Sequence, residues 1–205
     1  SSSFWDCGNV NYFGKHIMTT QNDETALGQG SSVKMETQET MKIIAAGNIF
    51  TGTFERDGMG GILTLGRNFE CRPNKLKGYY KYTSAKVSVS KGHLNEGEDD
   101  LCSLYIALTD EQITVNTNKG IYFDPNSSAV IAYGSISDEE SKGADSFKEF
   151  TVDLEYKDLK RIPKYIIVVA SSSKYGDYME GGKGSTMWLD DLELVYPKSM
   201  EEVRK

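Results

Sequence analysis

The run Tyr165-Ile-Ile-Val-Val-Ala170 decides the fold class of this chain. It is apolar along its whole length, as expected of a central strand that is covered on both faces of its sheet. Pro163 lies just before the run, where the missing amide donor of proline costs no ladder hydrogen bond. We therefore predict a buried strand in the middle of a sheet.

Segments with a strand-like pattern recur on both sides of this run, bounded by Gly, Asn, Asp and Pro, whereas helical periodicity is scarce. Many strands separated by polar turns are typical of a sandwich or barrel. We therefore predict an all-β fold. The expected strands cover residues 32–39, 42–54, 62–65, 75–89, 102–109, 129–137, 148–154, 165–172 and 185–196.

The chain of 205 residues is long enough for one β-sandwich, and no repeat, low-complexity tract or interdomain linker interrupts its pattern. We predict a single domain over residues 1–198 and a tail over residues 199–205. The segment 1–30 is expected to be irregular and to wrap the sandwich. The segment 91–100 is expected to be a charged, solvated loop.

The net charge of −7 and the lack of a long basic run exclude a nucleic-acid partner. No apolar stretch approaches the roughly 20 residues that a membrane-spanning helix needs. The sequence opens with Ser1-Ser2-Ser3 and no Met, as in an excised fragment. We expect membrane contact only through an anchor outside this fragment.

Three cysteines are present, and their odd number and spacing fit neither a closed disulfide framework nor a zinc module. Cys102 alternates with Leu104 and Ile106 on one face of an expected strand, which predicts a buried free thiol. A bridge between Cys7 and Cys71 stays open at this point.

The sequence gives little support for nucleophilic or phosphate chemistry. The two histidines, His16 and His93, lie in polar contexts, and no Gly-x-Ser-x-Gly elbow is present. The segment from Gly176 to Ser185 resembles a phosphate loop only superficially, because Lys183 comes one residue late and a strand follows instead of a helix. We interpret it as a mobile glycine-rich loop that joins two strands.

Paired carboxylates would be the strongest sign of an enzyme, since glycoside hydrolysis needs two of them about 5–9.5 Å apart. No pair stands out in the sequence, because acidic residues are abundant and most of them are expected to be solvated. Hydrolysis therefore stays an alternative function. The candidate acids are Glu96, Glu98, Asp99, Asp100, Asp138, Glu139, Asp153, Glu155, Asp190 and Asp191.

Asp190 stands out among these acids. In the run Met187-Trp-Leu-Asp-Asp-Leu-Glu-Leu-Val-Tyr196, alternation places it on one face with Trp188, Leu192 and Leu194. A carboxylate on an apolar face must be paired, hydrogen-bonded or bound to a cation. A structural Ca²⁺ held by Asp190 and Asp191 is one interpretation. A carboxylate that caps backbone amides of a neighbouring loop is the other, and we favour it.

Sugar binding requires a flat aromatic platform flanked by hydrogen-bonding groups, and tyrosine supplies 12 residues of this chain. In Gly78-Tyr-Tyr-Lys-Tyr-Thr83, Tyr80 and Tyr82 share one face, and Tyr79 and Lys81 share the other. A second segment, Ser171-Ser-Ser-Lys-Tyr-Gly-Asp-Tyr178, places Tyr175 and Tyr178 in an expected loop. In either segment the tyrosines could instead be ordinary half-buried packing. The candidate ligand-binding residues are Trp5, Tyr79, Lys81, Lys174, Tyr175 and Tyr178.

Several runs resemble one known family, the "putative carbohydrate metabolism domain" of secreted proteins and lipoproteins from gut anaerobes. The resemblance extends from about Phe4 to Tyr196. The runs that carry it are Ala45-Ala-Gly-Asn-Ile-Phe-Thr-Gly52, Leu76-Lys-Gly-Tyr-Tyr-Lys-Tyr82, Val130-Ile-Ala-Tyr-Gly134, Ile167-Val-Val-Ala-Ser-Ser-Ser-Lys-Tyr-Gly-Asp-Tyr178 and, with Gly182, Gly184-Ser-Thr-Met-Trp-Leu-Asp-Asp191.

The resemblance implies an antiparallel β-sandwich of jelly-roll type, similar to carbohydrate-binding modules. It also implies a first strand upstream of Ser1, whose acidic residues would complete a calcium site with the Asp of the final strand. We expect a noncatalytic carbohydrate-binding or glycan-handling module of an exported or cell-surface protein, periplasmic or anchored as an outer-membrane lipoprotein. A glycoside hydrolase with an acidic pair and a structural or adhesion spacer domain are the alternatives.

Overall fold

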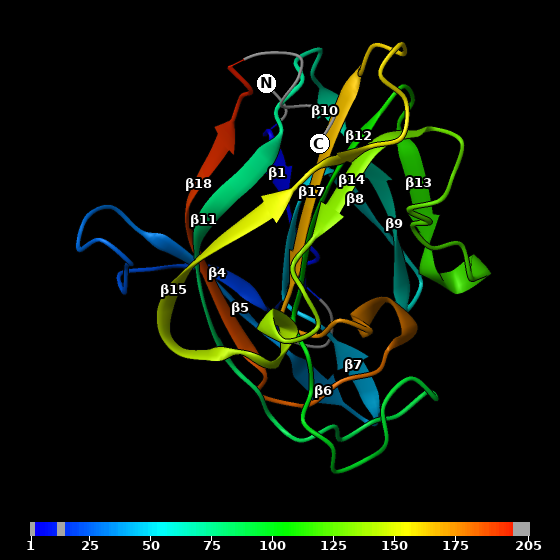
Figure 1. Cartoon of the computed structure of the whole chain (residues 1–205). Helices are drawn as coiled ribbons and strands as arrows, with labels where there is room; N and C mark the ends of the chain where they lie inside the picture. The colour runs from blue at the N-terminus through cyan, green and yellow to red at the C-terminus, as the bar shows by residue number, and fades with distance from the viewer. Residues whose placement is uncertain (1–2, 12–14, 199–205) are drawn as a thin grey trace.

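Two antiparallel sheets face each other across the core of the computed structural model, which describes residues 3–11 and 15–198 (Figure 1). The sandwich is of jelly-roll type, as predicted. The larger sheet has the order β13 (Ile113–Asn116), β9 (Gly60–Leu65), β8 (Asn48–Asp57), β17 (Tyr165–Ser171), β12 (Ser103–Thr109), β14 (Val130–Ser135) and β16 (Glu155–Tyr156). At its margin β1 (Trp5–Asp6) pairs with β8, and β10 (Arg67–Asn68) pairs with β17.

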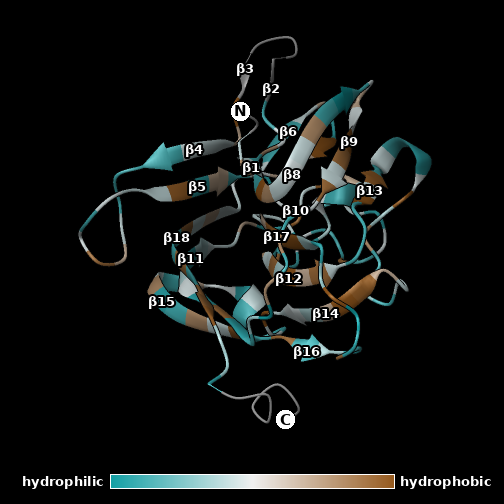
Figure 2. Cartoon of the chain, turned by 90° about the horizontal axis from the view of Figure 1, so that it is seen from above, coloured by the Kyte–Doolittle hydropathy of each residue, from teal (hydrophilic) through white to brown (hydrophobic). Residues whose placement is uncertain are grey.

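The smaller sheet has the order β15 (Ala144–Asp153), β11 (Lys75–Thr83), β18 (Thr186–Val195), β5 (Ser32–Glu36) and β4 (Thr19–Asn22). Its β4–β5 hairpin projects from the side of the molecule (Figure 2). Two small ribbons stand apart from both sheets, β2 (Val10–Asn11) with β3 (Lys15–His16) and β6 (Gln38–Thr40) with β7 (Ile43–Ala45). Three short 3₁₀ turns complete the described fold: η1 (Thr117–Lys119), η2 (Glu140–Lys142) and η3 (Gly176–Tyr178).

The predicted central strand is confirmed. β17 lies between β8 and β12, and its successive side chains enter two different hydrophobic clusters. Ile166, Val168 and Ala170 belong to the core between the sheets. Ile167 and Val169 belong to a second cluster on the opposite face of the larger sheet. This double burial explains why the run has no polar alternation.

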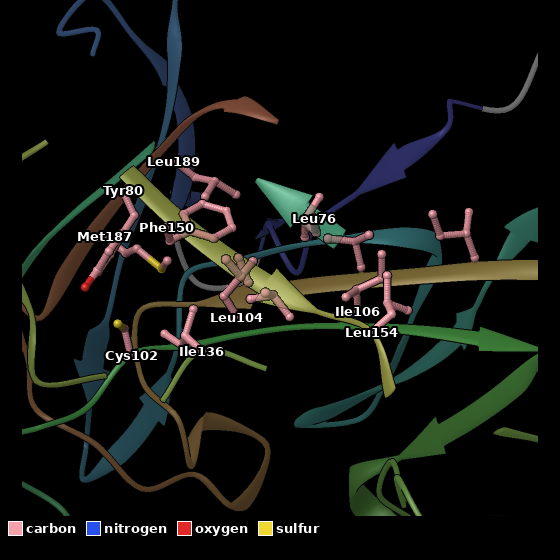
Figure 3. Packing of buried hydrophobic residues seen from close by; sticks show 14 of the residues in the cluster. Leu76, Tyr80, Cys102, Leu104, Ile106, Ile136, Phe150, Leu154, Met187 and Leu189 are labelled. Carbon is pink, nitrogen blue, oxygen red and sulfur yellow. The ribbon is translucent and has the colours of Figure 1, made fainter. Parts of the chain in front are cut away.

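The main core lies between the sheets, where side chains of β12 meet those of β11 and β15 (Figure 3). Tyr80 is fully buried and makes an edge contact with the Phe150 ring, with the centroids 6.0 Å apart. Its hydroxyl donates to the carbonyl oxygen of Glu140 at 3.0 Å. Tyr82 is buried beside it, so Tyr79 and Lys81 form the outward set of this strand.

A β-bulge in β18 changes the predicted alternation of that strand. Asp191 has a left-handed backbone, with φ of +48°, and the pairing of β18 with β11 shifts at this point. Asp190 therefore points outward, whereas Leu192 and Leu194 turn inward and pack on the core. The prediction that these leucines share a face with Asp190 is wrong, because a bulge inserts one extra residue into the alternation.

Gly78 makes room for this bulge on the neighbouring strand. A Cβ at this position would lie 2.8 Å from Leu192 and 3.0 Å from Phe150. The glycine in the Leu76–Tyr82 run is thus required by close packing, and it is no sign of a loop.

Some strand boundaries differ from the predictions. The expected strand 75–89 ends at Thr83, after which the chain leaves the sheet and forms single bridges only. The expected strand 42–54 is two strands, separated at Gly47, where a Cβ would lie 2.4 Å from the amide nitrogen of Glu36. The sequence patterns also missed β1, β4 and β13, and the two-residue strands β2, β3, β10 and β16.

Cys102 is buried and free, as predicted, and Cys7 and Cys71 are free thiols. No helix in the described ranges is long and apolar enough to cross a membrane. The predicted tail at 199–205 lies outside the described residues.

Candidate ligand-binding site

The connection between β17 and β18 brings four aromatic side chains together at one end of the sandwich. We call His93, Tyr122, Tyr175 and Tyr178 the aromatic cluster. The His93 ring stacks on Tyr175 with centroids 4.4 Å apart, and it contacts Tyr178 at the same separation. Tyr178 in turn stacks on Tyr122 at 4.1 Å. Tyr178 is 36% exposed, so the stack presents ring surface to solvent.

A buried carboxylate holds this cluster in place. Glu180 follows η3 and is fully buried, and its side chain accepts hydrogen bonds from the backbone amides of Lys91, His93 and Leu94 at 2.7, 3.2 and 2.5 Å. It also contacts Nδ1 of His93 at 3.1 Å. One side chain of the β17–β18 connection thus fixes the loop that carries the His93 ring.

The pKa of Glu180 shows the balance of these interactions. Burial raises the pKa, but the hydrogen bonds from Leu94 and His93 outweigh it, and the net pKa lies below the ordinary value of the carboxyl group. Glu180 is therefore ionised at neutral pH and accepts from the loop amides. A carboxylate with a lowered pKa stabilises the fold above its ordinary pKa, and this stabilisation is lost as the pH falls through the folded value.

The base of the same connection is anchored by a buried polar network around Asp100. The Asp100 carboxylate accepts from the hydroxyls of Ser173 and Ser185 at 2.6 and 2.8 Å, and from the amides of Gly182 and Leu101, each at 2.8 Å. All of Asp100 is buried. The prediction that residues 91–100 are all solvated is wrong at this position.

Thr37 extends the network to the linker between β5 and β6. Its hydroxyl lies 2.8 Å from that of Ser172 and 2.6 Å from that of Ser173. Because these hydroxyls follow β5 and β17, the network joins the ends of strands from both sheets beneath the aromatic cluster.

Burial raises the pKa of Asp100 despite its hydrogen bonds.

A groove of about 340 Å³ lies on the other side of η3. Its walls come from the β6–β7 hairpin, from β8 and the turn before β9, and from η3 itself, which is part of the orange connection in Figure 1. η3 packs closely on the hairpin, since a Cβ on Gly176 would lie 2.4 Å from the Cβ of Ala46. Met179, which ends η3, has a left-handed backbone with φ of +58°.

Asp177 lies in η3 between the groove and the aromatic cluster. It lines the groove and is open to solvent there. The surrounding protein nevertheless desolvates its carboxyl group, and this raises the pKa of Asp177. Among the described residues, no hydrogen bond or ion pair reaches its carboxylate. Asp177 is the one acid among the described residues that line the groove. No second carboxylate thus faces it there in the arrangement that two-acid glycoside hydrolysis requires.

The predicted ligand-binding residues lie in three separate parts of the fold. Tyr175 and Tyr178 belong to the aromatic cluster, and Lys174 lies at its edge, 6.0 Å from the Tyr175 ring and 3.1 Å from the Asp138 carboxylate. Trp5, in β1, is half-buried and packs against the main core.

Tyr79 and Lys81 lie on the outer face of the smaller sheet. Lys81 is 4.3 Å from the centre of the Trp188 ring and forms an ion pair with Glu24 at 2.5 Å. The role of these residues in ligand binding stays a prediction.

Backbone amides surround the Asp190 carboxylate. Its two carboxylate oxygens accept from the backbone amides of Ala26 and Asp191 at 2.8 and 3.0 Å. Within residues 3–11 and 15–198, no three His, Cys, Asp or Glu side chains come together as metal ligands. The arrangement is the amide cap that we favoured, with the amide of Ala26 supplied by the β4–β5 loop.

Residues 2–195 match the model of the family described as "Putative carbohydrate metabolism domain". The chain belongs to this family. The carbohydrate metabolism domain is carbohydrate-related by its description, and no protein of curated function matches this sequence.

Two solved structures resemble this carbohydrate metabolism domain over most of its length. One is described as a "putative glycoside hydrolase" from Bacteroides thetaiotaomicron, with 25% identity and a TM-score of 0.74 over 95% of this chain and 63% of that chain. The second, described in the same words, is from Bacteroides vulgatus, with 24% identity and a TM-score of 0.70 over 87% of this chain and 77% of that chain. The domain thus spans less than two thirds of the first structure.

In this carbohydrate metabolism domain, the run Ser171-Ser-Ser-Lys-Tyr-Gly-Asp-Tyr178 has two structural roles. Its serine half enters the buried network of Asp100, and its second half forms the aromatic cluster and one wall of the groove. Sequence reasoning missed His93, Tyr122, Asp177 and Glu180. Asp177 lies inside the run that carried the resemblance, and that position was the one available signal.

Proposed function

We propose that this domain is a noncatalytic carbohydrate-binding module whose ligand stacks on the aromatic cluster. The observation that carries the proposal is the exposed stack of Tyr178 on Tyr122, held next to His93 by Glu180. A sugar ring offers a C–H face that packs on an aromatic plane, and a preformed stack loses little entropy on binding. Lys174 and Asp138 supply charged groups at the edge for the hydroxyls.

The test begins with a glycan array and the purified chain, followed by calorimetry with each glycan that binds. We expect Tyr178→Ala and Tyr175→Ala to weaken binding about tenfold or more, as for aromatic residues at the centre of an interface. Tyr79→Ala is the matched control, because this tyrosine lies on the smaller sheet. A loss with Tyr79→Ala alone would place the site on that sheet and contradict the proposal.

A glycoside hydrolase is the second candidate function, and Asp177 is the observation in its favour. A carboxyl group with a raised pKa beside a groove is suited to act as a general acid. We expect no release of reducing sugar from any glycan that binds. Turnover that disappears with Asp177→Asn would establish the hydrolase instead.

A further inference from the structure

The groove beside η3 has a different chemistry from the aromatic cluster. Four methionines line it, and the other large apolar residues of its walls are Ile43, Ile44, Phe54 and Leu63. Met41 and Met59 are 82% and 59% exposed, although apolar side chains of this size are usually covered. The methionines are Met18, Met41, Met59 and Met179.

Most polar side chains of the groove already have partners within the protein. The side-chain oxygen of Asn48 accepts from the amide of Gly8 at 2.7 Å. The Thr117 hydroxyl accepts from the amide of Gly61 at 3.3 Å, and the Gln38 amide donates to the carbonyl oxygen of Ile17 at 3.1 Å. A sugar in this groove would leave most of its hydroxyls against thioether and aliphatic groups, which is unfavourable.

Two charged side chains, Arg56 and Asp177, line the groove. Arg56 is engaged within the protein, and its Nε donates to the carbonyl oxygen of Gly58 at 3.1 Å. Asp177 differs, because no hydrogen bond or ion pair joins its carboxylate to another described residue. A negative charge next to apolar walls is costly unless a cation or a hydrogen-bond donor reaches it. A ligand that brings one positive group to Asp177 and covers the methionines with hydrocarbon would satisfy both features. Flexible methionine side chains adapt well to such a body.

We infer that the groove is a second binding site, specific for a small molecule with an apolar body and a protonated amine. The ammonium group pairs with the Asp177 carboxylate, and the hydrocarbon packs on the methionines. The volume of about 340 Å³ is at the small end of the range for ligand pockets, which indicates a compact ligand. This inference is independent of the glycan proposal, since the walls differ and Tyr175 and Tyr178 do not line the groove.

The methionines provide the means to test the inference in the intact chain. The protein is labelled with [¹³C-methyl]methionine and titrated with phenethylamine, and the signals are assigned with single Met→Leu variants. We expect the methyl signals of Met41, Met59 and Met179 to shift on addition of the amine. Met35 and Met187 are fully buried in the main core and serve as internal references that stay unchanged.

The charge requirement is tested with 2-phenylethanol, which replaces the ammonium by a neutral hydroxyl. We expect the amine to bind at least about tenfold more tightly than the alcohol, because hydrogen bonds to charged groups are stronger. Asp177→Asn should remove this preference and leave the affinity for the alcohol unchanged. The control Asp145→Asn makes the same charge change on an exposed residue of β15 and should retain the preference.

Three outcomes would overturn the inference. They are equal affinity for amine and alcohol in the wild type, an unchanged preference in Asp177→Asn, and shifts of Met35 and Met187 together with the groove signals. The last of these would indicate general loosening of the fold by the probe. Each outcome is distinct from a failure of glycan binding, which is measured on the tyrosine variants.

Discussion

Asp190 is a residue whose sequence context indicated burial and whose role depends on a backbone feature next to it. The chain passes through the left-handed conformation at Asp191, and the Asp190 carboxylate accepts the amide hydrogen of that residue together with that of Ala26. The same side chain therefore fixes both the bulge in β18 and the β4–β5 loop.

Asp190→Ala should lower the free energy of unfolding by about 1–3 kcal/mol, because two backbone amides lose a charged acceptor. Urea denaturation measures the change, with Glu193→Ala on an exposed position of the same strand as the control. We expect a chelator to leave the melting temperature of the wild type unchanged. A chelator effect that Asp190→Ala abolishes would establish the calcium interpretation instead.

Asp177 provides a second prediction at the level of one residue. Its pKa is raised by burial, so the folded state binds a proton more readily than the unfolded state does. Its ionised form therefore destabilises the fold at neutral pH, and this cost disappears as the pH falls through the raised folded value. Asp177→Asn should raise the melting temperature at pH 7, and the difference from the wild type should disappear towards pH 4. An equal difference at both values would contradict the assigned cause.

At the scale of elements, the aromatic cluster depends on how the loop 91–94 is fastened to the β17–β18 connection. Glu180→Gln keeps the shape of the side chain but removes its charge and one of its two acceptors. We expect faster hydrogen exchange at the amides of Lys91 and Leu94, and a glycan affinity reduced about tenfold, although no ring is lost.

Glu98→Gln is the control for this experiment. Glu98 lies in the connection between β11 and β12, which also carries residues 91–94, and its exposed carboxylate accepts from the backbone amide and the side chain of Asn95. It should leave the glycan affinity unchanged. If Glu180→Gln speeds exchange without changing the affinity, the His93 side of the cluster has no part in binding.

The strands were largely predictable, since the burial of alternate side chains leaves a pattern in the sequence. The run at 165–170 even revealed its central place, because both of its faces are covered. The bulge at Asp191 could not be predicted, since it depends on the absence of a side chain at Gly78 on the neighbouring strand. β1, β4 and β13 are short or polar, and the pairing partners of β1 and β13 lie far away in the sequence.

The candidate site was only partly predictable for a related reason. Tyr175 and Tyr178 lie in a loop whose composition suggested exposure. His93 and Tyr122 join them from segments that are remote in sequence and carry no pattern of their own. Asp100 looked like one more charge in an acidic loop, because hydroxyl partners from distant strands leave no trace in the local sequence.

For the whole molecule, the network around Asp100 is a polar link between strand ends of the two sheets. In Asp100→Asn, one of the two carboxylate oxygens is replaced by an NH₂ group, which is itself a donor. Depending on the orientation of the amide, this group would face the donor of Leu101 or the three donors of Ser173, Gly182 and Ser185. We expect it to lower the free energy of unfolding by about 2–4 kcal/mol. Asp99→Asn is the matched control, because Asp99 is exposed and pairs only with Lys86 at the surface. Equal stability of the two variants would show that the carboxylate charge is dispensable.

The residues of this network are synthesised at different times, and this affects when the domain can fold during translation. Asp100 and Ser185 are separated by 85 positions. At the usual rates of protein synthesis, Ser185 is added about 4–17 s after Asp100. During that interval the carboxylate lacks donors from the final strand and must keep its water. The core around it therefore closes only after the final strand of this domain, β18, has been synthesised, and until then the nascent chain leaves its apolar strands accessible to chaperones.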